Sequence, residues 1–171
     1  MHSSANVAGQ GDMDDRFPMT HERVNRAYRL AGLLLGNQDE AEDATQEALV
    51  RAWQRRGSVR NAEAWSAWFD RILVNICRDH MRARGRVKFL TSDVDLPARM
   101  GSDSFREVLD RDAVLRAVQS LDEECRIVVI LHYWDDLTLP MIAARTGWRL
   151  GTFKSRLHRA LEALRSSRRD G

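Results

Sequence analysis

The chain has 171 residues, of which 43% are hydrophobic and 30% are charged, and its formal net charge is only +2. The length suits one ordinary domain or two small ones. Because the net charge is nearly neutral, nucleic-acid binding cannot be predicted from net charge alone. No apolar run approaches the roughly 18 residues that a membrane span requires, and no basic segment followed by an apolar stretch marks a signal peptide. We therefore expect a cytoplasmic protein without membrane insertion.

Residues 1–18 are rich in Ser, Gly and Asp, which predicts a disordered tail. Helical spacing of apolar residues then predicts three helices, over residues 20–35, 38–55 and 61–84. Gly36 ends the first helix, and Asn61 is a good N-cap for the third. The predicted inner stripes are Ala41, Ala44, Ala48, Leu49, Ala52 and Trp53 in the second helix, and Trp65, Trp68, Phe69, Ile72, Leu73, Ile76, Cys77 and Met81 in the third.

Two surfaces of these helices carry charge. Residues 39–47 contain five acidic side chains and no basic one. On the third helix, Arg71, Asn75, Arg78 and Arg82 share the face opposite the apolar stripe, because their spacing is four, three and four. Such a face suits a nucleic-acid backbone and an unstacked base, but it suits an ordinary charged helix surface equally well.

The helical periodicity is lost over residues 85–104, where Gly85, Pro97 and Gly101 interrupt the pattern. So long a segment predicts a linker between two domains rather than a loop within one. We place the first domain at 19–88, the linker at 89–105 and the second domain at 106–169. Helices are predicted in the second domain over 106–119, 122–133, 139–145 and 150–167; residues 128–131 are rich in β-branched side chains, yet their spacing favours a helix over a strand.

The last two predicted helices form a helix-turn-helix. Thr138 and Pro140 suit the start of the first, and Gly147 suits the turn between them. Residues 138–170 contain eight basic side chains and only two acidic ones, so this end of the chain is basic. We predict that residues 152–165 enter the major groove of DNA, although a helix-turn-helix that never contacts DNA stays an alternative.

The outward face of that helix carries Thr152, Ser155, Arg159 and Glu162, with Arg156 and His158 on its flanks. Arginine pairs with guanine, and Ser or Thr can bind a base edge or a phosphate. Phosphate contacts are predicted for Arg149, Lys154, Arg165, Arg168 and Arg169.

The two cysteines, Cys77 and Cys125, lie far apart within apolar helical patterns, and we expect buried free thiols. A disulfide or a metal site is the alternative, but His80, three residues after Cys77, brings the number of ligands to only two, where a closed zinc site needs about four. Neither the acidic cluster nor Asp135 and Asp136 has metal-loop spacing. We therefore expect no metal, no cofactor and no catalytic constellation such as that of a nuclease.

Several segments resemble the bacterial extracytoplasmic-function (ECF, group IV) sigma factors of the sigma-70 family. GNQDEAEDATQEALVRAW, residues 36–53, is similar to the family's second conserved region and keeps a D-x-x-Q spacing at Asp43 and Gln46. AWFDRILVNICRDHMRAR, residues 67–84, resembles the next part of that region. SLDEECRIVVILHYWDDLTLPMIAARTGW and GTFKSRLHRALEAL, within residues 120–164, resemble the C-terminal conserved region.

The resemblance implies an all-α protein of two small domains, sigma-2 and sigma-4 with its helix-turn-helix, on a flexible linker. It implies no intrinsic catalysis. Such a chain is a monomer when free, binds core RNA polymerase through the β′ clamp helices and the β flap, and directs it to promoter DNA. Sigma-2 would recognise and help melt the −10 element, sigma-4 would read the −35 element, and an anti-sigma factor would hold the chain inactive.

Residue roles follow from the resemblance by position. Asp43, Gln46 and Glu47 would dock on the clamp helices. Asn75, with residues 56–61, would hold an unpaired base near the −10 element, on the same face as Arg71, Arg78 and Arg82. Contacts to the −35 element fall by position to Lys154, Ser155, His158 and Arg159, and the helical pattern itself adds Arg149, Thr152 and Arg156 to the predicted contacts. The sequence departs from the family pattern at Arg149, where Ser or Pro often caps the helix, and at Leu139-Pro140 in place of Tyr-Glu.

A stand-alone helix-turn-helix regulator that binds an operator as a dimer is the competing interpretation. Such a regulator needs a sensor pocket or a receiver domain. Three N-terminal helices with an acidic patch and an arginine stripe predict neither of these.

Overall fold

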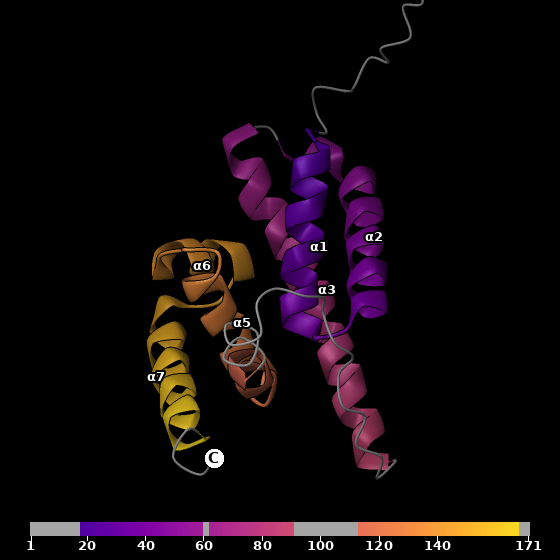
Figure 1. Ribbon diagram of the computed structural model, residues 1–171. Coiled ribbons are helices and arrows are strands. Elements are labelled where there is room, and N and C mark those ends of the chain that lie inside the picture. Colours follow the sequence, from indigo (N-terminus) through magenta and orange to yellow (C-terminus); the bar gives the residue numbers. More distant parts are fainter. Residues whose placement is uncertain (1–17, 60–61, 91–112, 168–171) are drawn as a thin grey trace, which may run out of the picture.

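The computed structural model describes residues 18–59, 62–90 and 113–167, and these residues form helices joined by turns, with no strand among them (Figure 1). The helices are α1 (His21–Leu35), α2 (Gln38–Gln54), α3 (Ala62–Leu90), α5 (Glu123–Tyr133), α6 (Leu139–Thr146) and α7 (Leu150–Ser167), with a 3-10 turn at Arg56–Ser58 and helical residues at 113–119. The predicted all-α class is therefore confirmed. Three parts of the prediction lie outside the described residues. They are the tail up to residue 17, Asn61, and residues 91–112 of the predicted linker and the helix that follows it.

The boundaries of α1 and α2 follow from their capping residues. The Thr20 hydroxyl accepts a hydrogen bond from the Arg23 amide at 3.3 Å, and Gly36 ends α1 at a φ of 68° in the left-handed region. Asn37 then caps α2 through its side-chain oxygen, which accepts from the Glu40 amide at 2.9 Å. Both helices begin where their cap residues predict.

The N-terminal half, α1–α3, packs around a stripe of small residues on α2. Its core consists of Ala27, Leu30, Ala31, Leu34 and Leu35 from α1, Ala41, Ala44, Ala48 and Ala52 from α2, and Trp65, Phe69, Leu73, Val74, Ile76 and Cys77 from α3. Trp53 does not belong to it, contrary to the prediction, since 48% of this residue is exposed and the Arg56 guanidinium lies 4.0 Å above its ring. Each residue turns a helix by about 100°, so Trp53 leaves the narrow stripe that ends at Ala52.

α3 is longer than predicted, because it continues past Arg84 to Leu90. The prediction that helical structure is lost from Gly85 onward is therefore wrong for residues 85–90. A Cβ at Gly85 would meet no atom within 4 Å, and its φ is not positive. One glycine in a helix costs about 1 kcal/mol relative to alanine, which does not end a helix when no left-handed turn follows.

The C-terminal half comprises residues 113–167. The Asp122 carboxylate caps α5 by accepting from the Cys125 amide at 2.8 Å, and residues 128–131 are helical and buried, as the spacing predicted. Gly147 ends α6 at a φ of 75°, and its amide donates to the Ala143 carbonyl at 2.8 Å. These elements form the predicted helix-turn-helix.

One detail at the start of α6 differs from the prediction. Thr138 occupies the N-cap position of α6, but its side chain makes no capping hydrogen bond there. In α7, the first residue, Leu150, is 44% exposed, whereas Phe153 and Ala160 are fully buried.

The two halves pack directly against each other. α6 contacts α3, and α5 contacts both α1 and α3, which places the helix-turn-helix beside the N-terminal three-helix unit (Figure 1). Cys77 and Cys125 are buried free thiols, as predicted. None of the described helices has the length and apolar character needed to cross a membrane.

Candidate nucleic-acid interface

The outward face of α7 presents most of the predicted contact residues to solvent. Lys154, Ser155, His158 and Arg159 are exposed, Thr152 is half-buried, and Arg149 is exposed at the turn before the helix. Phe153 and Ala160 are buried on the opposite side and fix the rotation of the helix against α5. The sequence-predicted face of α7 is thus accessible in this structure.

Arg159 lies over the N-terminal end of α5. Its guanidinium Nη2 is 3.4 Å from an Asp122 carboxylate oxygen and 3.7 Å from the Cys125 sulfur, yet 64% of the side chain stays exposed. Burial would raise the pKa of Asp122, but the hydrogen bonds from Cys125 and the charge of Arg159 lower it below its ordinary value. An anionic Asp122 therefore orients Arg159 without covering it.

Arg156 behaves differently from its neighbours on α7. Only 17% of its side chain is exposed, it forms an ion pair with Glu124 on α5, and its guanidinium lies 4.3 Å above the Trp148 ring. Trp148 in turn stacks on Phe153 with ring centroids 5.6 Å apart. Arg156 therefore joins α7 to α5 and to the turn. The sequence pattern did not identify Trp148 or Glu124 as its partners, although Trp148 directly follows the turn residue Gly147.

The arginines on α3 do share one face, and that face borders the C-terminal half of the chain while Arg71 and Arg82 stay exposed. The Arg71 guanidinium lies against Gly147, close enough that a Cβ there would be 2.7 Å from it. Arg78 lies 5.6 Å above the Trp148 ring, and the Arg82 Nε is 2.8 Å from a Glu123 carboxylate oxygen. Asn75, on the same helix, is half-buried.

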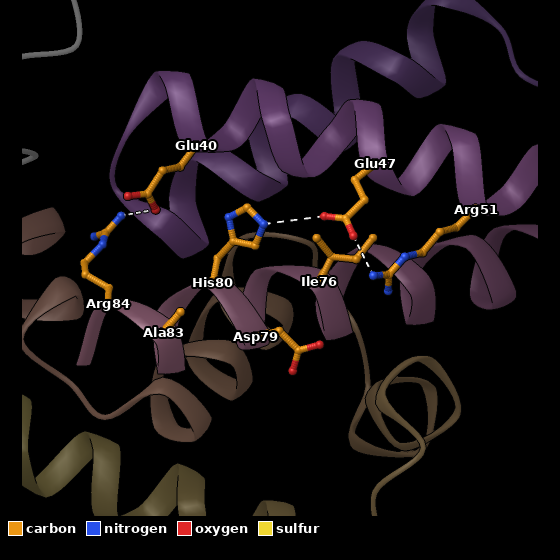
Figure 2. Close-up of a pocket in the computed structure, with 8 residues that line it drawn as sticks. All are labelled: Glu40, Glu47, Arg51, Ile76, Asp79, His80, Ala83 and Arg84. Carbon is orange, nitrogen blue, oxygen red and sulfur yellow. Dashed lines mark hydrogen bonds and ion pairs between the residues drawn. The ribbon is translucent and has the colours of Figure 1, made fainter. Parts of the chain in front are cut away.

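The acidic face of α2 is partly engaged in ion pairs. Asp43 and Gln46 are exposed, whereas Glu47 is half-buried. Glu47 pairs with Arg51 at 2.5 Å and lies 3.6 Å from the His80 Nε2 on α3, as the dashed lines in Figure 2 show.

These pairs border a groove of about 550 Å³ between α2 and α3, which is lined by Glu40, Glu47, Arg51, Ile76, Asp79, His80, Ala83 and Arg84. Figure 2 shows Arg84 reaching from α3 to Glu40 and His80 of the same helix facing Glu47, so two polar contacts join α2 and α3 across the groove. Val50, 56% exposed, and Trp53 add apolar surface to α2 that the sequence pattern did not reveal.

A group of four charges around the buried Asp70 joins the two halves of the chain. Asp70 on α3 is fully buried and binds two arginines, Arg26 from α1 at 2.8 Å and Arg145 from α6 at 2.6 Å. Asp135 binds the same two arginines at 2.5 and 3.3 Å. Burial alone would lower the pKa of Arg26, but the two carboxylates raise it above its ordinary range.

Asp135, considered above as a metal ligand, thus has arginine partners. Among the described residues no group of three His, Cys, Asp or Glu side chains could hold a metal ion.

Comparison with known proteins identifies both halves of the chain. Residues 20–87 match the family model for Sigma-70 region 2, and residues 111–164 match that for Sigma-70, region 4. The ECF RNA polymerase sigma factor SigW of Bacillus subtilis (strain 168) is 31% identical, over 94% of this chain and 92% of SigW. The ECF RNA polymerase sigma factor SigE of Mycolicibacterium smegmatis is 34% identical over 86% of this chain, which spans 59% of the length of that relative.

Solved structures agree with these sequence relatives. The sigma factor RpoE of Bartonella quintana, in complex with the anti-sigma factor NepR, superimposes with a TM-score of 0.65 at 28% identity, over 85% of this chain and 91% of RpoE. CnrH in complex with the cytosolic domain of CnrY shares the fold, with a TM-score of 0.57 at 22% identity over 85% of this chain and 82% of CnrH. With both sigma-70 regions matched in order and SigW aligned over nearly its whole length, the chain belongs to the ECF sigma factors of the sigma-70 family.

Proposed function

We propose that this chain is a promoter-specificity subunit, which binds core RNA polymerase and directs it to start transcription at defined promoters. The observation that carries the proposal is the exposed face of α7, where Ser155 and Arg159 stand on a helix-turn-helix within an ECF sigma factor. The chain acts in the cytoplasm, where polymerase and promoter DNA meet, and it contributes binding rather than catalysis.

The C-terminal half acts as sigma-4 and reads the −35 element. Arg159 is the main base reader, because its guanidinium is exposed and oriented by Asp122, and arginine binds guanine through two acceptors in the major groove. Ser155 lies one helical turn before it and supplies a hydroxyl to a base edge. Arg149, Thr152, Lys154 and His158 surround this pair and mainly hold the DNA backbone, which adds affinity without specificity.

Arg156 supports recognition from behind the contact face. Its ion pair with Glu124 and its position over Trp148 hold α7 against α5 and the turn. We therefore assign it a positioning role rather than the direct DNA contact that the sequence suggested.

The N-terminal half acts as sigma-2. Asp43 and Gln46 are exposed on α2 and dock on the β′ clamp helices, with Glu47 held beside them by Arg51. The C-terminal half adds a second contact, to the β flap. On α3, the single face formed by Arg71, Asn75, Arg78 and Arg82 contacts the DNA strand at the −10 element.

An anti-sigma factor controls the chain in this proposal. RpoE, which superimposes on this chain, is described in a complex with the anti-sigma factor NepR. An anti-sigma factor that contacts both halves would cover surfaces needed for polymerase, while the free chain is a monomer.

Substitution of Arg159 tests the proposed base reader. Holoenzyme reconstituted with Arg159→Ala should lose about 1–3 kcal/mol of discrimination for the preferred −35 sequence over a scrambled one, measured by run-off transcription from paired templates. Arg165→Ala is the matched control, since Arg165 is an exposed arginine on the same helix and a predicted phosphate contact; it should weaken both templates alike. An unchanged template preference with Arg159→Ala would remove Arg159 from base recognition.

A further inference from the structure

Two carboxylates at the start of α5 each face an arginine of α7. Glu124 pairs with Arg156, and this arginine is largely covered, since only 17% of its side chain is exposed. Asp122 lies 3.4 Å from the Arg159 Nη2, and the Arg159 side chain stays 64% exposed. The first pair thus joins α7 to α5, while the second leaves its arginine able to reach a ligand.

The two oxygens of the Asp122 carboxylate have different partners. Oδ1 accepts the capping hydrogen bond from the Cys125 amide at 2.8 Å, and Oδ2 faces Arg159. Capping fixes the carboxylate at the first turn of α5, so the position of Oδ2 is fixed as well. Although partial burial raises the pKa of Asp122, the hydrogen bonds from Cys125 and the charge of Arg159 lower it below its ordinary value. Asp122 therefore presents a negative charge to Arg159 from a fixed point on another helix.

Both contacts of the Arg159 guanidinium are made by the same nitrogen. Nη2 lies 3.4 Å from Oδ2 of Asp122 and 3.7 Å from the Cys125 sulfur, whereas Nη1 and Nε form no hydrogen bond to any residue that the structure describes. A guanidinium carries donors on each of its nitrogens, and the O6 and N7 atoms of guanine accept from a pair of them. The contacts at Nη2 therefore restrict the side chain while donors remain for a base.

An exposed arginine beside DNA has two kinds of target. A phosphate attracts it with a full negative charge and carries no sequence information, whereas guanine binds it through neutral acceptors. The Asp122 carboxylate repels a phosphate that approaches Arg159, since like charges a few ångströms apart disfavour each other, but it does not repel a neutral base edge in this way. The carboxylate therefore biases Arg159 away from phosphate and toward guanine.

We propose that Asp122 is a specificity-determining residue of −35 recognition, which acts from α5 and makes Arg159 read a base rather than hold a phosphate. The inference rests on the proposed role of Arg159 as base reader, and it adds a residue outside the helix-turn-helix to the recognition surface. Asp122 is a positioning residue, because it acts through Arg159 and not on the base itself. Its negative charge lowers the general affinity for DNA while it raises specificity.

Variants at Asp122 separate this role from the capping of α5. Serine and asparagine are good N-caps, so Asp122→Ser and Asp122→Asn keep the cap while they remove the charge that faces Arg159. Glu162→Gln is the matched control, because it removes a carboxylate of α7 that lies beside His158. Thermal unfolding verifies that all three variants retain the fold.

The measurement uses holoenzyme reconstituted from the full chain and bacterial core RNA polymerase. Its templates derive from one promoter that the wild-type holoenzyme transcribes, and each template carries one base-pair change in the −35 element. Run-off transcription then gives the base preference at every position of the element. Arg159→Ala identifies the base pair that Arg159 reads, because this substitution removes the preference there.

We expect Asp122→Asn and Asp122→Ser to lower the preference at that base pair about threefold to fivefold, the effect that one exposed ion pair can supply. Preferences at the other base pairs should stay at their wild-type values, and Glu162→Gln should keep the preference at the base pair that Arg159 reads. In an Arg159→Ala background, Asp122→Asn should have no further effect on base preference, because the two residues act through one contact.

The possible failures can be told apart. Wild-type preferences in both Asp122 variants, where Arg159→Ala does change one position, would overturn the role of Asp122 and leave Arg159 as base reader. An equal loss at all positions would overturn it too, since the substitution would then disturb α7 as a whole. If Arg159→Ala changes no preference, the proposed base reader fails and the role of Asp122 fails with it. A wild-type holoenzyme without promoter-specific transcription would refute the proposed function itself, and with it this inference.

Discussion

Replacing Gly147 by alanine probes the turn on which the helix-turn-helix depends. Gly147 has a φ of 75°, and an L-residue in the left-handed region costs roughly 1–2 kcal/mol. The new Cβ would also come within 2.7 Å of the Arg71 guanidinium, but this group ends a flexible side chain and can move aside. We therefore expect Gly147→Ala to lower the free energy of unfolding by about 1–2 kcal/mol, nearly all of it from the backbone.

Urea unfolding followed by circular dichroism measures this loss, and three further variants isolate its cause. Gly147→Asn should cost less than Gly147→Ala, because asparagine tolerates the left-handed region better. Gly151→Ala should not destabilise, since Gly151 lies in α7 with a negative φ and with no atom within 4 Å of a Cβ. The Gly147→Ala cost should persist in an Arg71→Ala background. Full rescue by Arg71→Ala, or equal effects of alanine at 147 and 151, would refute the backbone argument.

Two further predictions concern groups whose pKa the fold changes. Asp122→Ala should lower the free energy of unfolding by about 0.5–2 kcal/mol, because α5 loses its cap. Asp122→Asn should keep most of the stability that the cap contributes, since asparagine can also cap a helix. Thermal unfolding measures both differences. Because the pKa of Asp122 is lowered, its contribution should be present above the ordinary carboxyl value of 3.8 and disappear as the pH falls through the folded value; a pH-independent difference between wild type and Asp122→Ala would contradict this. Burial raises the pKa of the Cys77 thiol to about 12, so this thiol should resist alkylation in the folded chain and react once urea unfolds it. Rapid alkylation of Cys77 under native conditions, detected by mass spectrometry of its peptide, would contradict its burial.

The local structure was largely predictable because its causes are local. Caps such as Thr20 and Asn37, and the left-handed glycines at 36 and 147, fix helix ends within a few residues. Apolar spacing identified the core helices and kept residues 128–131 helical despite their β-branched side chains. Where single residues were misjudged, as at Trp53, a helical-wheel argument could not tell the edge of a stripe from its centre.

The relation between the two halves could not be predicted from periodicity. Asp70 is a polar residue on an apolar side of α3, and its burial makes sense only once Arg26 and Arg145 are brought to it from distant parts of the chain. The α3 arginine stripe was correctly placed on one face, but no local signal shows what that face meets. Long-range ion pairs depend on the packed fold, so they become visible only in three dimensions.

We propose that this chain is a polymerase subunit rather than an independent DNA-binding regulator. The most direct measurement is size-exclusion chromatography with light scattering of the chain mixed with bacterial core RNA polymerase, followed by transcription of genomic DNA by the isolated complex. The proposed function predicts a 1:1 complex that starts transcription at defined promoters, which core polymerase alone does not do. A chain that elutes apart from core polymerase and binds a palindromic duplex tightly as a dimer would contradict it.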